Sequence, residues 1–171
     1  LLKLTSDLHF ACSASKSEFS HPLANSNVTT HDIVLNDSSF NDFISDLQPD
    51  IVVYDRFIIE EQFGWRVKQQ FPNIISVLDT EDLHFVRRAR TEAFKKNTVI
   101  NFDTTDCYRE LSAIYRCDLS IIISKIEYSL LVDHFNIPKE QLLYLPFIEE
   151  EISIEKQNEL PEFSKRKNFM F

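Results

Sequence analysis

Three carboxylates and one imidazole lie close together in the segment Asp79–His84, whose sequence is DTEDLH. Groups of these types at this spacing could accept a proton, orient a hydroxyl or bind a cation. The same residues could instead be structural, because Asp79 suits a helix N-cap and Glu81 and Asp82 would complement the dipole of a helix beginning there. The segment is the first candidate for a functional site, with Asp79, Glu81 and His84 as its candidate catalytic residues.

A metal or cofactor site is not expected in this chain. No second histidine lies near His84 in the sequence, and a hard cation needs more oxygen ligands than the segment offers by itself. The chain also contains a single glycine, Gly64, where average usage would give roughly a dozen. Loops that cradle phosphates need several glycines, so no such loop lies within the chain.

Other polar residues follow predicted strands. Asp55 and Arg56 come directly after the apolar run Ile51–Tyr54, and Ser124 comes directly after a run that ends at Ile123. Ligands of open α/β sheets bind beyond the carboxyl ends of the strands, so these three polar residues are candidates for substrate binding. Asp55 and Arg56 could equally form a local ion pair.

Arg87 and Arg88 extend the polar face of the predicted helix that carries His84. His84, Arg87, Arg88 and Thr91 share one face at helical spacing. Such a face could meet an anionic acceptor or partner, which makes the two arginines candidates for substrate binding, or it could simply be solvated.

The elements that must position these residues alternate along the chain. Short β-rich runs and longer helical patterns follow one another, which is typical of βαβ units and a parallel sheet. The predicted strands are 8–12, 32–35, 51–54, 74–78, 119–123 and 142–144. The predicted helices are 39–47, 60–70, 80–96, 104–116 and 125–135. The predicted fold class is therefore α/β, a Rossmann-like parallel sheet flanked by helices.

Local patterns refine this prediction. The continuously apolar runs 51–54 and 121–123 indicate central strands covered on both faces. Ser124 and Glu127 have the spacing of a capping box at a helix start. Trp65, in an apolar helical pattern, is predicted to pack inside.

Composition excludes several classes of function. With 27 Asp and Glu against 18 Lys and Arg, the formal net charge is −9, which disfavours nucleic acid as a partner. Cys12, Cys107 and Cys117 form no C-x-x-C pair and are read as the reduced thiols of a cytosolic protein. No run approaches the roughly 18 apolar residues of a transmembrane helix, and no signal peptide is evident, so the predicted location is cytoplasmic.

The chain is predicted to contain most of one domain. Residues 1–148 carry the alternating pattern, and the charged segment 149–168 reads as a linker or surface excursion. The apolar residues 169–171 read as the start of a further strand.

Taken together, these landmarks resemble the nucleotide-sugar-dependent glycosyltransferases of the GT-B architecture, GT4 type. Leu47–Tyr54 is similar to their Pro-Asp-plus-strand element, and Arg116–Glu127 to their Ala-Asp-strand-Ser-x-x-Glu element. Phe135–Pro146 is similar to the helix end, proline and short strand that precede their crossover. Asp55–Arg66 followed by Leu78–His84 resembles one bacterial branch of these enzymes.

The resemblance implies that this chain is the acceptor-side, N-terminal half of a retaining transferase that needs no metal. A glycan or small-molecule acceptor would meet Asp79, Glu81 and His84, and the nucleotide-sugar donor would bind a second half beyond Phe171. The family's first strand, with its glycine-containing loop, would precede Leu1. The chain by itself is therefore expected to transfer no sugar.

Two other readings use the same strand ends. A stand-alone flavodoxin-like module could bind a small ligand or a protein there. A response-regulator receiver would pair an aspartate with a later lysine, as Asp55 and Lys125 could, but the acidic pair expected after the first strand is missing.

Overall fold

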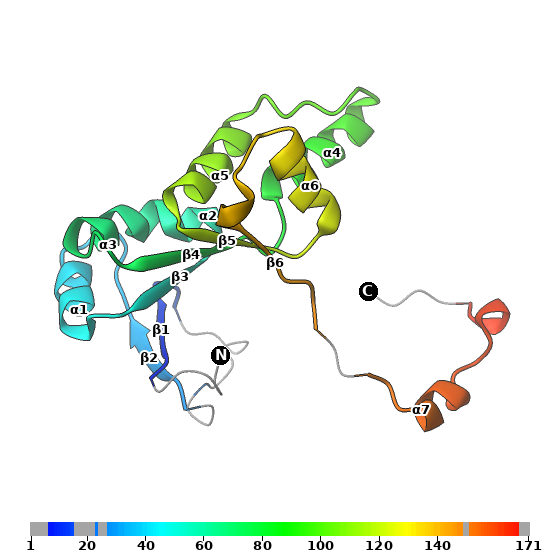
Figure 1. The fold of residues 1–171 in the computed structure, drawn as a ribbon, viewed down its shortest axis with the longest axis horizontal. Helices are drawn as coiled ribbons and strands as arrows, with labels where there is room; N and C mark the ends of the chain where they lie inside the picture. Colours follow the sequence, from blue (N-terminus) through cyan, green and yellow to red (C-terminus); the bar gives the residue numbers. More distant parts are fainter. Residues whose placement is uncertain (1–6, 16–22, 24–26, 149–150, 168–171) are drawn as a thin grey trace.

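The computed structural model describes residues 7–15, 23, 27–148 and 151–167. The chain forms an α/β structure with two parallel sheets flanked by helices (Figure 1). β1 (His9–Cys12) pairs with β2 (Thr29–Asp32) in the smaller sheet. The larger sheet has the order β3 (Ile51–Asp55), β4 (Ile75–Asp79), β5 (Leu119–Ile122) and β6 (Leu142–Tyr144).

This arrangement confirms the predicted Rossmann-like fold class, but the strands divide between two sheets. The helices are α1 (Ser39–Leu47), α2 (Arg56–Ile59), α3 (Trp65–Gln70), α4 (His84–Lys96), α5 (Thr105–Arg116), α6 (Lys125–Asp133) and α7 (Ile154–Glu159). Short stretches of other helix types are the π-helix η2 (Glu60–Gly64) and the 3₁₀-helices η3 (Lys139–Gln141) and η4 (Phe163–Lys165).

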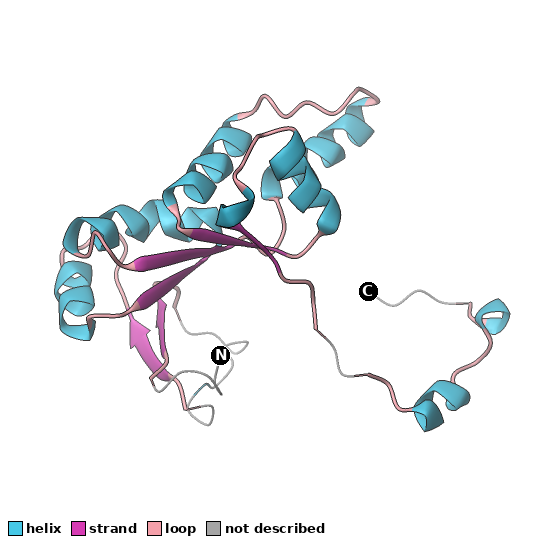
Figure 2. Cartoon of the chain, viewed as in Figure 1, coloured by secondary structure: helices cyan, strands magenta, loops and turns pink. Residues whose placement is uncertain are grey.

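The main hydrophobic core lies between the larger sheet and the helices that cover it. In Figure 2, α4, α5 and α6 lie above this sheet. Tyr54, Leu78 and Ile122 point from the strands into this core, where they meet residues such as Phe85 and Ile114. A second cluster joins α1, η2 and α3 to the start of β4, through Phe40, Ile44, Phe63, Val67 and Ile74.

The opposite face of the larger sheet is exposed along β3 and at the start of β4, which contradicts the prediction that strand 51–54 is covered on both faces. β3 lies at an edge of its sheet. Ile51, Val53 and Ile75 alternate with the core residues and remain 55%, 49% and 52% exposed. An apolar strand face therefore lies at the surface, because the covering helices α4, α5 and α6 lie on the other side.

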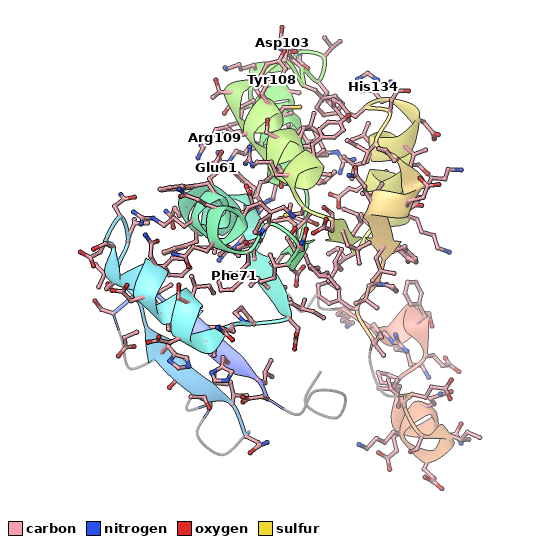
Figure 3. The ribbon with its side chains drawn as sticks, turned by 60° about the vertical axis from the view of Figure 1, so that its left-hand side comes forward. Glu61, Phe71, Asp103, Tyr108, Arg109 and His134 are labelled. Atoms are coloured by element: carbon pink, nitrogen blue, oxygen red, sulfur yellow. The ribbon has the colours of Figure 1, made fainter. Side chains whose placement is uncertain are left out.

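The helix predicted at 60–70 begins earlier, at Arg56, and contains the π-helical turn η2. In this turn the buried Glu60 forms an ion pair with Arg116, with Nε to Oε1 at 2.9 Å. Arg109 of α5 likewise binds Glu61, at 3.0 Å, and the two labelled side chains lie together in Figure 3. The neighbouring Trp65 is 56% exposed, so the prediction that it packs inside is wrong.

The second strand lies earlier than predicted, at Thr29–Asp32 instead of 32–35. His31 of this strand stacks on His9 of β1, with Nδ1 of His9 2.8 Å from Nε2 of His31. Ile33, predicted to lie in the strand, instead packs against the second core cluster.

The part of the chain after β6 runs away from the sheet (Figure 1). Residues 151–167, within the predicted linker, include α7 and η4 and are exposed throughout. Residues 149, 150 and 168 of that linker, and the strand predicted to begin at 169–171, lie outside the described residues. In the parts of the chain that the structure describes, no helix has the length and apolar character needed to cross a bilayer.

The cysteines agree with the prediction of reduced thiols. Cys12, Cys107 and Cys117 are all free. Burial raises the pKa of Cys107 to about 11 and that of Cys117 to about 12, so both thiols are protonated near neutral pH.

Candidate functional site

The start of α2, directly after β3, and the loop after β4 meet at the carboxyl edge of the larger sheet. Asp55 and Asp79 are the last residues of these strands and are partners in the parallel register. The two segments that the sequence identified separately are therefore neighbours, as expected for the carboxyl ends of parallel strands.

Two residues that closely follow these strands, the first residue of α2 and one in the loop after β4, adopt the left-handed backbone conformation without being glycine. Arg56 has φ 68° and Glu81 has φ 55°. A non-glycine residue in this region costs on the order of 1 kcal/mol or more, and such strain is concentrated at functional sites. Arg56 binds both carboxylate oxygens of Asp55, at 3.1 and 3.0 Å, and its Nε lies 3.7 Å from Oε2 of Glu81. Asp55 and Arg56 thus form the predicted local ion pair within the candidate site.

The segment 80–83 is a turn and not the start of a helix, which corrects the predicted helix 80–96. Asp79 accepts a hydrogen bond from the Glu81 amide at 3.1 Å, so it stabilises the turn instead of capping a helix. The buried Thr80 donates its hydroxyl to the carbonyl of Ile121 at 2.8 Å. Helix α4 begins only at His84, so Glu81 and Asp82 lie before the helix and not in its first turn.

His84 is buried, which corrects its predicted place on the exposed polar face of α4. Its Nε2 lies 3.2 Å from Oδ1 of Asp82, and its ring meets the edge of Phe57 at 5.8 Å between centroids. Burial lowers the pKa of His84, although Asp82 opposes the shift. The imidazole is therefore neutral near neutral pH and able to accept a proton.

Arg87 and Arg88 of α4 are exposed, as predicted, but each forms an ion pair with an aspartate. Nε of Arg87 lies 2.8 Å from Oδ2 of Asp82. Arg88 forms an ion pair with Asp106 of α5. Of these two arginines, only Arg87 therefore contacts the loop after β4.

Ser124 caps α6, and this half of the predicted capping box is confirmed. Its hydroxyl oxygen accepts a hydrogen bond from the Glu127 amide at 3.4 Å. The Glu127 carboxylate, however, accepts a hydrogen bond from the Leu83 amide at 3.4 Å. The other half of the predicted box is absent from the described part of the chain, where this carboxylate contacts the loop before α4 through Oε1 and its Oε2 has no hydrogen-bond partner.

Glu110 of α5 is a component of the site that the sequence reasoning missed. Its carboxylate accepts hydrogen bonds from the amides of His84 and Phe85, at 3.1 and 2.9 Å. Burial raises the pKa of Glu110 to about 7, which the two amide bonds oppose. A signal was present in the sequence, since Glu110 lies at helical spacing with the apolar Cys107 and Ile114 and must therefore be buried with them.

Two cavities lie away from this edge. One of about 110 Å³ is bordered by residues near the other ends of β4 and β5, among them Ser76, Arg116 and Cys117. The other, of about 310 Å³, lies beyond β1 and β2 and is lined by Cys12 and Asp32 among others.

The arrangement at the carboxyl edge is suited to hydrogen bonding and proton acceptance. Asp55, Asp79 and Glu81 offer carboxylate oxygens, and His84 offers a neutral imidazole. Within the described ranges, no three or more His, Cys, Asp or Glu residues are grouped so that they could hold a metal ion. Comparisons of the chain with models of protein families, with curated proteins and with solved structures found no match.

Proposed function

We propose that this chain is the acceptor-side domain of a cytoplasmic, nucleotide-sugar-dependent, retaining glycosyltransferase of the GT-B architecture. The observation that carries the proposal is the register pair of Asp55 and Asp79 at the carboxyl edge, beside the strained residues Arg56 and Glu81. Ligands of parallel α/β sheets bind at this edge. The segments that resemble the bacterial transferases also contribute these four residues.

An acceptor that carries hydroxyl groups suits the polar groups available here. Carboxylates such as those of Asp79 and Glu81 accept hydrogen bonds from sugar hydroxyls, and Arg56 and Arg87 offer positive charge for an anionic substituent. In the transfer step, the acceptor oxygen forms the new bond to the anomeric carbon while the bond to the nucleotide diphosphate breaks. The neutral imidazole of His84 is the group suited to receive the hydroxyl proton.

The donor would be bound by a second domain of the parent protein, so residues 1–171 are expected to transfer no sugar by themselves. The test is an assay of acceptor-stimulated nucleotide release by the protein expressed from the full reading frame. We expect His84→Ala to reduce kcat by about a hundredfold, since a positioned proton acceptor contributes that much or more. Asp79→Asn should also reduce the rate, because it replaces a carboxylate proposed to accept a hydrogen bond from the acceptor hydroxyl.

The matched control is Asp46→Asn, which changes an exposed aspartate of α1. It should leave kcat unchanged. Wild-type rates in both site variants would refute the proposal. Saccharide binding at the carboxyl edge without any transfer by the full-length protein would favour a binding module instead.

A further inference from the structure

The first turn of α4 is held by carboxylates from two other helices. Glu110 of α5 accepts hydrogen bonds from the His84 and Phe85 amides, and Glu127 of α6 accepts one from Leu83. The N-cap residue of α4, Leu83, has no side chain that could satisfy these amides. From this geometry we infer that Glu110 and Glu127 are positioning residues that hold the segment 79–85 closed, and that their ionisation favours its opening.

Both carboxylates are buried without a cation to neutralise them. Glu110 is 1% exposed and Glu127 is 8% exposed. Neither forms an ion pair with any residue that the structure describes, and Oε2 of Glu127 is buried with no hydrogen-bond partner among those residues. A buried carboxylate held only by amide dipoles is costly to ionise.

The charged and titratable groups around the pair do not remove this cost. Asp82, in the loop, disfavours ionisation of both carboxylates, and Glu127 disfavours that of Glu110. Arg90 of α4 favours ionisation of Glu127, but this effect is smaller than that of burial. Two groups next to the pair, the Cys107 thiol and the His84 imidazole, are neutral near neutral pH because burial raises the pKa of the first and lowers that of the second.

The direction of the pH effect follows from linkage. With the segment closed, the pKa of Glu110 is about 7, whereas a hydrated glutamate titrates near 4.5. The closed state binds the proton more tightly than the open state, so it is most favoured below about pH 4.5 and loses this advantage as pH rises through about 7. Opening hydrates the carboxylates and relieves the cost of their ionisation.

This opening has a consequence for the site, and that consequence rests on the proposed function. The segment carries Asp79, Glu81 and His84, so an open segment would withdraw all three from an acceptor. The opening itself does not depend on sugar transfer and can be measured without any substrate.

Hydrogen exchange of the chain tests the inference. The probes are the amides of Leu83, His84 and Phe85, with rates corrected for the intrinsic effect of pH, and the amide of Leu78 in the middle of the sheet. We expect the three amides to exchange faster than Leu78 at about pH 8 and to gain protection by at least about tenfold at about pH 5.

Glu110→Gln provides the matched variant, because its amide is isosteric with the protonated carboxyl group and does not titrate. This substitution should abolish most of the pH dependence. Glu92→Gln, an exposed glutamate of α4 paired with Lys96, should leave it intact. If Glu110→Gln does not fold, the NMR titration of the wild-type Glu110 carboxyl carbon serves instead.

Three results would overturn the inference. The first is equal protection of the three amides and of Leu78 at every pH, since only global unfolding would then expose them. The second is a pH dependence that persists in the folded Glu110→Gln variant. The third is a Glu110 carboxyl group that titrates near 4.5, as a hydrated glutamate does.

Discussion

Gly64, the only glycine of the chain, has a steric role. A Cβ atom at this position would lie 2.7 Å from Oε1 of Glu60, which is buried and paired with Arg116. The φ of Gly64 is −59°, a conformation open to any residue. Gly64 therefore serves to leave room for the Glu60 carboxylate within η2.

This role predicts an effect of Gly64→Ala that depends on residue 60. In the wild-type background the methyl group displaces the Glu60 carboxylate, and the free energy of unfolding should fall by about 1 kcal/mol or more. In a Glu60→Ala background the same change should raise it by up to about 1 kcal/mol, because alanine is the better helix former. Urea unfolding of the four proteins measures both effects, and stabilisation in both backgrounds would contradict this account.

Among the elements, the helix boundaries of α1, which follow from its local sequence pattern, agree with prediction. The start of α4, which depends on a residue distant in the sequence, does not. Helix α1 spans Ser39–Leu47, as predicted from its apolar spacing. Helix α4 was predicted from Thr80 but begins at His84, because Glu110 binds the amides at that point. A residue distant in the sequence also stabilises the start of β4. The Asp118 carboxylate accepts hydrogen bonds from both the amide and the hydroxyl of Ser76, at 2.8 and 2.7 Å.

The hydrogen bonds between Asp118 and Ser76 of β4 should weaken in acid. The hydrogen bonds from Ser76 lower the pKa of Asp118 in the folded chain, so they stabilise the fold above about pH 4 and this contribution is lost as pH falls further. Asp118→Asn should lower the free energy of unfolding by about 1 kcal/mol at neutral pH and by less near pH 3. Urea unfolding at the two pH values, with Asp46→Asn as control, measures the difference. If Asp118→Asn lowered the free energy of unfolding equally at both pH values, ionisation of Asp118 would not contribute to stability.

At the scale of the whole molecule, helices cover one face of the larger sheet, and the other face is exposed along β3 and at the start of β4. Parallel sheets normally bury both faces. Here Ile51, Val53 and Ile75 form an exposed apolar strip across β3 and β4, where the register pairs Ile51 with Ile75. Such a strip favours association with another apolar surface.

The open face predicts concentration-dependent self-association of the isolated chain. Sedimentation velocity should show larger species as the concentration rises, and the triple substitution Ile51→Thr, Val53→Thr and Ile75→Thr should shift the sample toward monomer, because threonine keeps the β-branched shape and removes apolar surface. The control is Val77→Thr on the same face, a site only 9% exposed, which should lower stability with little effect on association. A wild-type chain that stays monomeric at high concentration would refute the prediction.

The sequence by itself determined the α/β alternation, the parallel sheet and the position of Asp55 and Asp79 at strand ends, because these follow from apolar periodicity and from the rule for strand ends. Only the tertiary structure decided that His84 is buried, that Glu110 and Glu127 hold the first turn of α4, and that one sheet face is open. Each of these depends on contacts between residues far apart in the chain, such as the 26 positions between His84 and Glu110. A local pattern does not encode which distant carboxylate satisfies an amide, or which face of a sheet the helices cover.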